Sequence, residues 1–206
     1  MYFESTLVWA VLLLENHDRI KRILELFLIR KEKSVGRYAL KDMLDLTEGK
    51  TRGRLKKLQD EGLIRETKQG ATITKRGERA LHRLLSSMNI AAMDTLDVGP
   101  LKTGHESTVV HVRGRASEIE TAKYTHLRDE AVRVGAQGAT IIIFSNGKLS
   151  VPAVFPDLEM KYQSIARMLL KRFGLASGDI LIVGSASTKW KAMEGALAVA
   201  LALTKK

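Results

Sequence analysis

The 206-residue sequence contains no cysteine and only three prolines, and aromatic residues make up 5% of it. The absence of cysteine excludes disulfides, thiolate metal sites and cysteine nucleophiles, and it fits the reducing conditions of a cytoplasm. With so few aromatics, cores must be built from Leu, Ile, Val, Ala and Met, for which a hydrophobic content of 45% is sufficient. This length favours two small domains over one.

Asparagine and glutamine are also scarce, and 28% of the residues are charged. This combination favours a thermophilic source. The net charge of +11 favours polyanions as partners. Because the positive charge is spread over both halves of the sequence, the net charge does not show which half binds nucleic acid. Only the local arrangement of cations can identify that half.

The sequence also lacks an apolar run of about 20 residues, the length that a transmembrane helix needs. The run Leu7–Leu14 stops at Glu15 and follows Glu4, whereas a signal peptide begins with basic residues. We interpret this run as a helix or strand packed in the core or in a dimer interface. We therefore expect a cytoplasmic protein with no membrane partner.

The N-terminal part, residues 1–90, has the pattern of three helices, a hairpin and a fourth helix. The expected elements are a helix from an N-cap at Asn16 or Asp18 to about Arg30, helices over 37–44 and from the N-cap Thr47 to Gly62, strands over 63–68 and 71–74, and a helix over about 76–87. Periodicity is lost after this, and residues 91–106, which contain Gly99-Pro100, are predicted to be a linker.

The C-terminal part, residues 107–206, alternates helices with strands that are continuous runs of Ile and Val. The expected strands are 108–112, 139–144, 149–153 and 180–183, and the expected helices are 119–134, 158–173 and 188–203. Such strands are typical of a sheet covered on both faces. The predicted fold class is therefore α+β or α/β, an N-terminal helical domain followed by an α/β domain with a mixed sheet.

The third expected helix carries five cations and no acid between Gly49 and Gln59. With 3.6 residues per turn, Thr51, Leu55 and Leu58 face inward. Lys50, Gly53 and Lys57 then point outward, and the remaining cations lie on the flanks, unopposed. A major groove admits one such helix, and Lys or Arg contacts phosphates or guanine there.

The segment from Thr47 to Ile64 resembles the recognition helix of winged helix-turn-helix regulators, and Ile73–Gly77 resembles their passage from wing to helix. The resemblance covers residues 16–88, and the domain order is similar to that of archaeal regulators with an uncharacterised C-terminal domain. It implies a wing tip at residues 68–70 that reaches the minor groove or phosphates. The candidate DNA-binding residues are Lys50, Arg52, Gly53, Arg54, Lys57, Lys68, Gln69, Lys75 and Arg76. A solvated helix face, or a winged helix that binds protein or RNA, stays open as an alternative.

The second domain offers a candidate anion site where a buried strand meets a helix. Free backbone N–H groups and hydroxyls gather at such a point. The candidate ligand-binding residues are Ser145, Gly184, Ser185, Ser187 and Thr188. Ser187 or Thr188 is equally well explained as an ordinary N-cap. No nucleotide-binding glycine motif is present, and the histidines His105, His111 and His126 lack metal-ligand spacing, so no cofactor, metal or catalytic residue is predicted.

The last helix, 192–203, is apolar almost all round, which predicts burial in the flank of the sheet or between two subunits. A homodimer suits a DNA-binding protein, since two helices one DNA turn apart gain specificity. The sequence therefore predicts a non-enzymatic, homodimeric transcription regulator that binds double-stranded DNA. Its C-terminal domain would pair the subunits and is a candidate for binding a small anionic effector. The alternatives are an enzyme with its chemistry in the α/β domain, and a protein-interaction scaffold.

Overall fold

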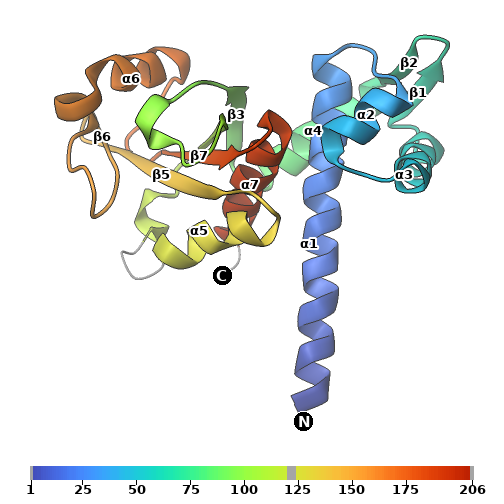
Figure 1. The fold of residues 1–206 in the computed structure, drawn as a ribbon, viewed down its shortest axis with the longest axis horizontal. Helices are drawn as coiled ribbons and strands as arrows, with labels where there is room; N and C mark the ends of the chain where they lie inside the picture. Colours follow the sequence, from blue (N-terminus) through green and yellow to red (C-terminus); the bar gives the residue numbers. More distant parts are fainter. Residues whose placement is uncertain (1, 120–123, 205–206) are drawn as a thin grey trace. The chain divides into compact units, whose positions relative to one another are not determined.

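The computed structural model describes residues 2–119 and 124–204, with the backbone alone for residues 2–15 and 125. It forms two compact units that divide between Leu85 and Ser86. The helices and strands of both units are shown in Figure 1. Each unit has its own core and is described separately.

The N-terminal unit has the predicted order of elements. They are α1 (Tyr2–Lys31), α2 (Arg37–Leu44), α3 (Glu48–Asp60), β1 (Ile64–Thr67), β2 (Gly70–Ile73) and α4 (Lys75–Ser86). Strands β1 and β2 form an antiparallel hairpin, and Val35 adds an antiparallel bridge to Ala71. Gly62 follows α3 with a φ of +69°, which a glycine adopts without steric cost. Three helices followed by a hairpin are the winged helix-turn-helix arrangement that the sequence indicated.

Helix α1 is longer than predicted, because it begins at Tyr2 and passes through Asn16 and Asp18 without a break. The prediction of an N-cap at either residue was wrong. No glycine or proline occurs between residues 2 and 31, so nothing in the sequence stops the helix at these two polar residues. The apolar run Leu7–Leu14 lies in this helix, but its side chains fall outside the described residues, so the prediction that they are buried is not tested.

The C-terminal unit is built on a five-stranded sheet. Its elements are β3 (Ile90–Thr95), η1 (Gly99–Leu101), β4 (Glu106–Val112), η2 (Ala116–Glu118), α5 (Tyr124–Arg133), β5 (Gly138–Ser145), β6 (Lys148–Ser150), α6 (Leu158–Arg172), β7 (Ile180–Ala186) and α7 (Lys189–Ala202). The strand order is β3-β4-β7-β5-β6. Together with the helical N-terminal unit this gives an α+β protein.

Every pairing in the five-stranded sheet is antiparallel, so the predicted mixed sheet was wrong. The last strand in the sequence, β7, is inserted between β4 and β5 and runs against both. Strands β4 and β5 therefore share a direction but never pair. The apolar composition of the strands predicts that both faces of the sheet are covered, but it does not predict the order of the strands.

The segment predicted as a linker, residues 91–106, belongs to the folded C-terminal unit. It contributes the edge strand β3, which pairs with β4, and the buried residues Val98 and Leu101. An edge strand pairs on one side only, and most side chains of β3 are exposed or half-buried. It therefore lacks the alternation of apolar and polar residues from which a strand is predicted.

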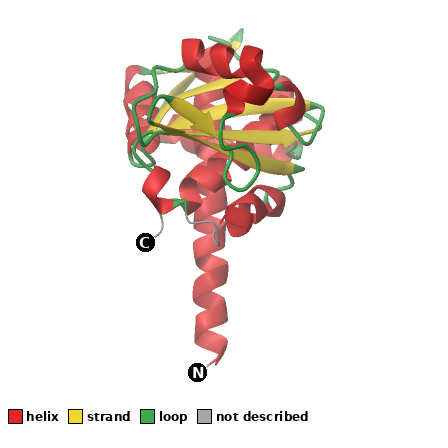
Figure 2. Ribbon diagram, turned by 90° about the vertical axis from the view of Figure 1, so that its left-hand side faces the viewer, coloured by secondary structure: helices red, strands yellow, loops and turns green. Residues whose placement is uncertain are grey.

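Helices cover both faces of the sheet, as the apolar strands predicted (Figure 2). Helix α6 packs on one face, where Leu158, Leu169 and Phe173 join a core with residues from β4, β5 and β7. Helix α7 packs on the other face, against β7 and β4 and beside α5. Residues 190 and 192–201 of α7 are all buried. Of the two explanations for this apolar helix, the flank of the sheet is the one observed.

Glycine 184 sets how closely β7 approaches α7, because a Cβ atom there would lie 2.0 Å from the carbonyl oxygen of Ala192. We expect Gly184→Ala to lower the free energy of unfolding of the C-terminal unit by about 1–3 kcal/mol, since the strand and helix must separate. Urea unfolding followed by the fluorescence of buried Trp190 measures this loss. The control is Gly174→Ala, where nothing lies within 4 Å of the added Cβ. Equal stability of the two variants would contradict the packing argument.

Candidate nucleic-acid interface

The exposed face of α3 is set by its cap and by three inward residues. The Thr47 hydroxyl accepts the N–H of Lys50 at 3.4 Å and so caps the helix, as predicted. Thr51, Leu55 and Leu58 are buried. The opposite face carries three residues that are all exposed, as the helical spacing predicted: Lys50, Gly53 and Lys57.

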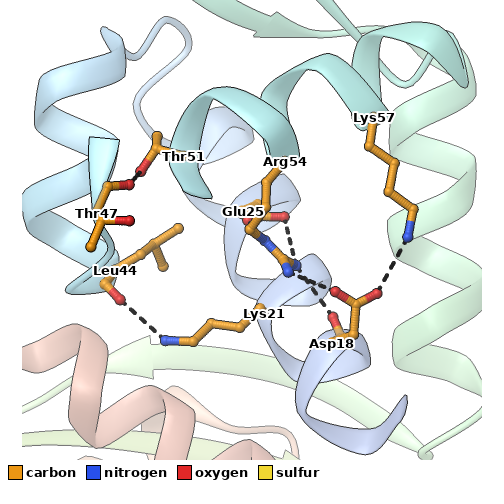
Figure 3. A network of polar contacts seen from close by, with 8 residues as sticks. All are labelled: Asp18, Lys21, Glu25, Leu44, Thr47, Thr51, Arg54 and Lys57. Carbon is orange, nitrogen blue, oxygen red and sulfur yellow. Dashed lines mark hydrogen bonds and ion pairs between the residues drawn. The ribbon is translucent and has the colours of Figure 1, made fainter. Parts of the chain in front are cut away.

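Arg54 does not belong to this exposed face, because its guanidinium turns back onto α1 (Figure 3). Its Nη2 donates to Oε2 of Glu25 at 3.2 Å, and its Nε donates to the other oxygen of the same carboxylate. Its Nη1 donates to Oδ1 of Asp18 at 2.6 Å. Only 24% of the Arg54 side chain and 2% of the Glu25 side chain are exposed. The prediction placed Arg54 on the flank of the helix as an unopposed DNA contact, whereas its guanidinium is paired with acids of α1.

A buried cation of α1, Lys21, contacts the end of α2. Lys21 is 4% exposed and its Nζ donates to the carbonyl oxygen of Leu44 at 3.1 Å, at the C-terminal end of α2. Carbonyl groups at that end have no partner within the helix and carry partial negative charge, which an ammonium group stabilises. Through Lys21 and Glu25, which lie one turn apart on α1, the same helix fixes both helices of the helix-turn-helix (Figure 3).

The two acids of this network respond differently to it. Burial raises the pKa of Glu25 above its ordinary value, and the hydrogen bond from Arg54 offsets this only in part. Burial acts in the same direction on Asp18, but the hydrogen bond and charge of Arg54, aided by Lys57 and Arg22, outweigh it and lower the pKa of Asp18. The Glu25 carboxylate therefore depends on Arg54 to stay ionised, whereas Asp18 has several cations around it.

We expected the other cations of α3 to be unopposed, but two of them have acidic neighbours. Arg52 pairs with Glu48 at 3.3 Å, and Lys57 approaches Asp18 at 3.6 Å. Among the described residues Lys50 and Lys56 have no ion-pair partner. The expectation counted acids only between Gly49 and Gln59. Glu48 lies just before this range, and the partners of Arg54 and Lys57 lie on α1, more than 25 residues earlier.

The predicted wing tip is an ordered turn with exposed side chains. Lys68 and Gln69 are exposed, and the Ser34 hydroxyl donates to the carbonyl oxygen of Gln69 at 2.9 Å. Gly70 has a φ of +123°, and a Cβ there would lie 2.5 Å from the carbonyl oxygen of Val35. Lys75 and Arg76 are exposed at the start of α4. The structure thus presents all four of these candidates at the surface.

Two surface residues beside α3 were not among the predicted candidates for DNA contact. Tyr38, at the start of α2, is 60% exposed, and Arg37 donates from Nη2 to its hydroxyl at 3.1 Å. Arg37 also reaches Glu48, the first residue of α3, at 3.3 Å. An aromatic residue beside an arginine at the start of the second helix is the signal that would have found them.

The candidate ligand residues of the C-terminal unit do not come together. Gly184 is packed on α7, Ser185 is fully buried, and the Thr188 hydroxyl accepts the N–H of Lys191 at 3.2 Å as an ordinary N-cap. Ser187 is exposed. Ser145 lies at the far end of β5, since the antiparallel register pairs Ser185 with Gly138, about 24 Å from Ser145 along the strand. Ser145 and residues 184–188, which were predicted as one set of ligand-binding candidates, therefore lie at opposite ends of the sheet.

His111 is a core histidine with a carboxylate partner. Its Nε2 lies 2.8 Å from Oδ2 of Asp179, which also accepts the N–H of Ala176 at 3.0 Å. Burial opposes ionisation of Asp179, but these hydrogen bonds lower its pKa below the ordinary value. Within residues 2–119 and 124–204 no group of three His, Asp or Glu residues is placed to hold a metal ion.

Removing Arg54 tests whether the pair under α3 is structural. We expect Arg54→Gln to lower the free energy of unfolding of the N-terminal unit by about 2–4 kcal/mol at pH 7, because Glu25 stays buried without its cation. The pKa of Glu25 should rise further, and a group with a raised folded-state pKa loses stability as pH rises. The deficit relative to the unmodified protein should therefore shrink between pH 7 and pH 5.

Chemical denaturation at the two pH values measures this difference. The control is Lys57→Gln, which removes an exposed neighbour of Asp18 and should cost less than 1 kcal/mol at either pH. A deficit of Arg54→Gln that is equally small would show that Arg54 does not hold α3 to α1.

Comparison with known proteins agrees with this division into two units. Residues 20–88 match the family described as "CggR N-terminal DNA binding domain", and residues 103–203 match a "Domain of unknown function (DUF4443)". No curated protein matches the chain. A solved structure, "Hypothetical protein PH0730 from Pyrococcus horikoshii OT3", is similar over 89% of this chain and 91% of its own, with a TM-score of 0.70 and 27% identity.

Within the described part of the chain no helix combines the length and apolar character needed to cross a membrane. The interface on α3 and the wing lies within the first matched segment, and the five-stranded sheet lies mostly within the second. The chain therefore joins a regulator DNA-binding domain of winged-helix type, at residues 20–88, to a C-terminal domain of unknown function.

Proposed function

We propose that the protein is a transcription regulator that lays the exposed face of α3 in the major groove of double-stranded DNA. The observation that carries the proposal is the separation of the two faces of this helix. Its inward face is buried and tied to α1 through Arg54, while Lys50, Gly53 and Lys57 stand exposed on the other side. A helix held on one face and cationic on the other fits the width of the groove.

The residues of α3 take different roles in this proposal. Lys50, in the first turn, and Lys57 contact phosphates or guanine edges. Gly53 has no neighbour within 4 Å of a Cβ position, so the helix itself does not require a glycine there, and its small size allows DNA to approach the backbone. Arg52 is 67% exposed and can leave Glu48 for a phosphate. Arg54 positions the helix and makes no DNA contact.

The wing supplies the flanking contacts. Lys68 and Gln69 at its tip reach the adjacent minor groove or phosphates, and Lys75 and Arg76 contact the backbone at the base of the wing. The hydrogen bond from Ser34 and the close approach of Gly70 to Val35 hold the tip against the start of α2. A tip fixed in this way loses less conformational freedom on binding than a mobile loop.

We also propose that the regulator acts as a homodimer, since one winged helix reads only a short stretch of sequence. Because α7 is almost entirely buried, we place the pairing surface elsewhere on the chain. A small anionic effector is not part of this proposal, because the residues predicted to bind it are separated or buried. The Pyrococcus neighbour supports the expectation of an archaeal, thermophilic source.

Salt dependence of duplex binding tests the roles on α3. In Lys50→Gln/Lys57→Gln the slope of log K against log salt should flatten by about 1.8, since each lost phosphate contact removes about 0.9. The matched control, Arg167→Gln/Lys171→Gln, removes two exposed cations from α6 and should keep the slope of the unmodified protein. An unchanged slope in the α3 variant would remove both lysines from the interface.

Static light scattering at micromolar concentration tests the homodimer. The chain has a mass of 22.9 kDa, so the proposal requires about twice this value. Measurement with and without a duplex separates a preformed dimer from one assembled on DNA. The monomer mass without the duplex, together with a mass of one protein chain per duplex in its presence, would exclude the homodimer while leaving the α3 interface untouched.

A further inference from the structure

Among the described residues, the positive charge of α4 is less compensated by acids than that of α3. Helix α3 has fewer free cations than the sequence suggested. Arg54, Arg52 and Lys57 all have acidic neighbours. Helix α4 carries Lys75, Arg76, Arg79 and Arg83 and a single acid, Glu78. None of these four cations has an ion-pair partner among the described residues, and all four are exposed.

The three arginines of α4 lie on one side of the helix. The spacing of Arg76, Arg79 and Arg83 by three and four residues places neighbouring guanidinium groups one turn apart. Together with His82 they line one open depression of about 540 Å³. Like charges at this spacing destabilise an isolated helix, and a solvated face usually alternates its signs. The arrangement therefore costs stability without any compensating contact in the described protein.

We call Arg76, Arg79 and Arg83 the α4 row. Interaction with the helix dipole explains only part of it. Arg83 lies in the last turn of α4, where a cation is favourable. Lys75 and Arg76 lie in the first turn, at the positive end of the dipole, where a cation is unfavourable. The charges of the first turn thus favour an external anion over an internal role.

The row is continuous with the surface around α3. A Cβ on Gly62, just beyond α3, would lie 3.8 Å from Cδ of Arg76. At the other end of the row, Arg83 lines a hollow with Asp18 and Arg22 of α1, and these two also line the gap beneath Lys57. Phosphates beside the duplex segment held by α3 would therefore meet the α4 row next.

We propose that Arg79 and Arg83 extend the contact of Arg76 into a second phosphate-binding row, which follows the backbone of the same DNA duplex from the base of the wing to beyond the segment covered by α3 and the wing. Arginine suits this role because its planar guanidinium binds phosphate oxygens in pairs. From Arg76 to Arg83 the row extends about 10 Å along the helix, close to the axial rise of three nucleotides in one strand. The face is open, whereas a site for a small molecule encloses most of its ligand.

This inference rests on the proposed binding of DNA, and the test separates the two. The variant is Arg79→Gln/Arg83→Gln in the full chain, which removes two charges while keeping residues with good helix propensity. Its binding to a mixed-sequence 30-base-pair duplex is measured across salt beside the unmodified protein, the α3 variant and the α6 control. Circular dichroism and thermal unfolding confirm that each variant is folded.

The expected result is a slope flatter by about 1.8 in the α4 variant, equal to the effect of the α3 variant. A second measurement shortens the duplex: the unmodified protein should lose affinity at a greater length than the α4 variant, because only it uses the outer phosphates. An α4 slope equal to that of the α6 control overturns the second row but leaves the α3 interface standing. Failure of the unmodified protein to bind any duplex overturns the proposed function itself.

Tripolyphosphate serves as the probe for a small-anion site. If it binds the unmodified protein and the α4 variant abolishes that binding while the duplex slope stays unchanged, the row is a site for a free anion and the DNA proposal is overturned. Competition of tripolyphosphate with the duplex, lost in the α4 variant, supports the proposal.

Discussion

The N-terminal unit depends on one buried ion pair, between Arg54 of α3 and Glu25 of α1. A carboxylate that is 2% exposed is strongly unfavourable without a cation, and the bidentate guanidinium satisfies both of its oxygens at once. Hydrophobic contacts of Leu55 and Leu58 hold α3 against the core but allow small rotations. The planar pairing of Arg54 restricts rotation of the helix, and the direction of the exposed lysines follows from it.

This pair changes how the charge of the unit should be interpreted. A cation used inside the protein cannot also neutralise a phosphate, so the number of lysines and arginines on a recognition helix overstates the contacts that it makes. On α3 the available cations are Lys50, Lys56 and, against weak competition from exposed acids, Arg52 and Lys57. The arginines of α4 face no such competition. Interaction with DNA therefore depends on where the acids are as much as on where the cations are.

Local signals predicted the N-terminal fold well, because the residues that determine it act over short distances. Thr47 caps α3, Gly62 ends it, and the inward stripe has helical spacing. The failures concern partners that are distant in sequence. The insertion of β7 between β4 and β5 made the sheet antiparallel, and that register placed Ser145 at the far end from Ser185. An edge strand such as β3 gains its order from β4, and its own side chains reveal little of it.

The role of Arg54 could nevertheless have been inferred from α1. Lys21 and Glu25 interrupt a stretch in which Ile20, Ile23, Leu24 and Leu26–Ile29 are all buried, so both charges had to be buried as well. A buried carboxylate needs a cation or several donors. Lys21 is used at the end of α2, and for its length the helix richest in cations is α3, which packs on α1 in a winged helix. With 3.6 residues per turn, Arg54 is the cation of α3 that lies nearest the inward stripe, whereas Lys50 and Lys57 lie further round the helix. The acid buried in one helix thus identifies the cation that the neighbouring helix cannot offer to DNA.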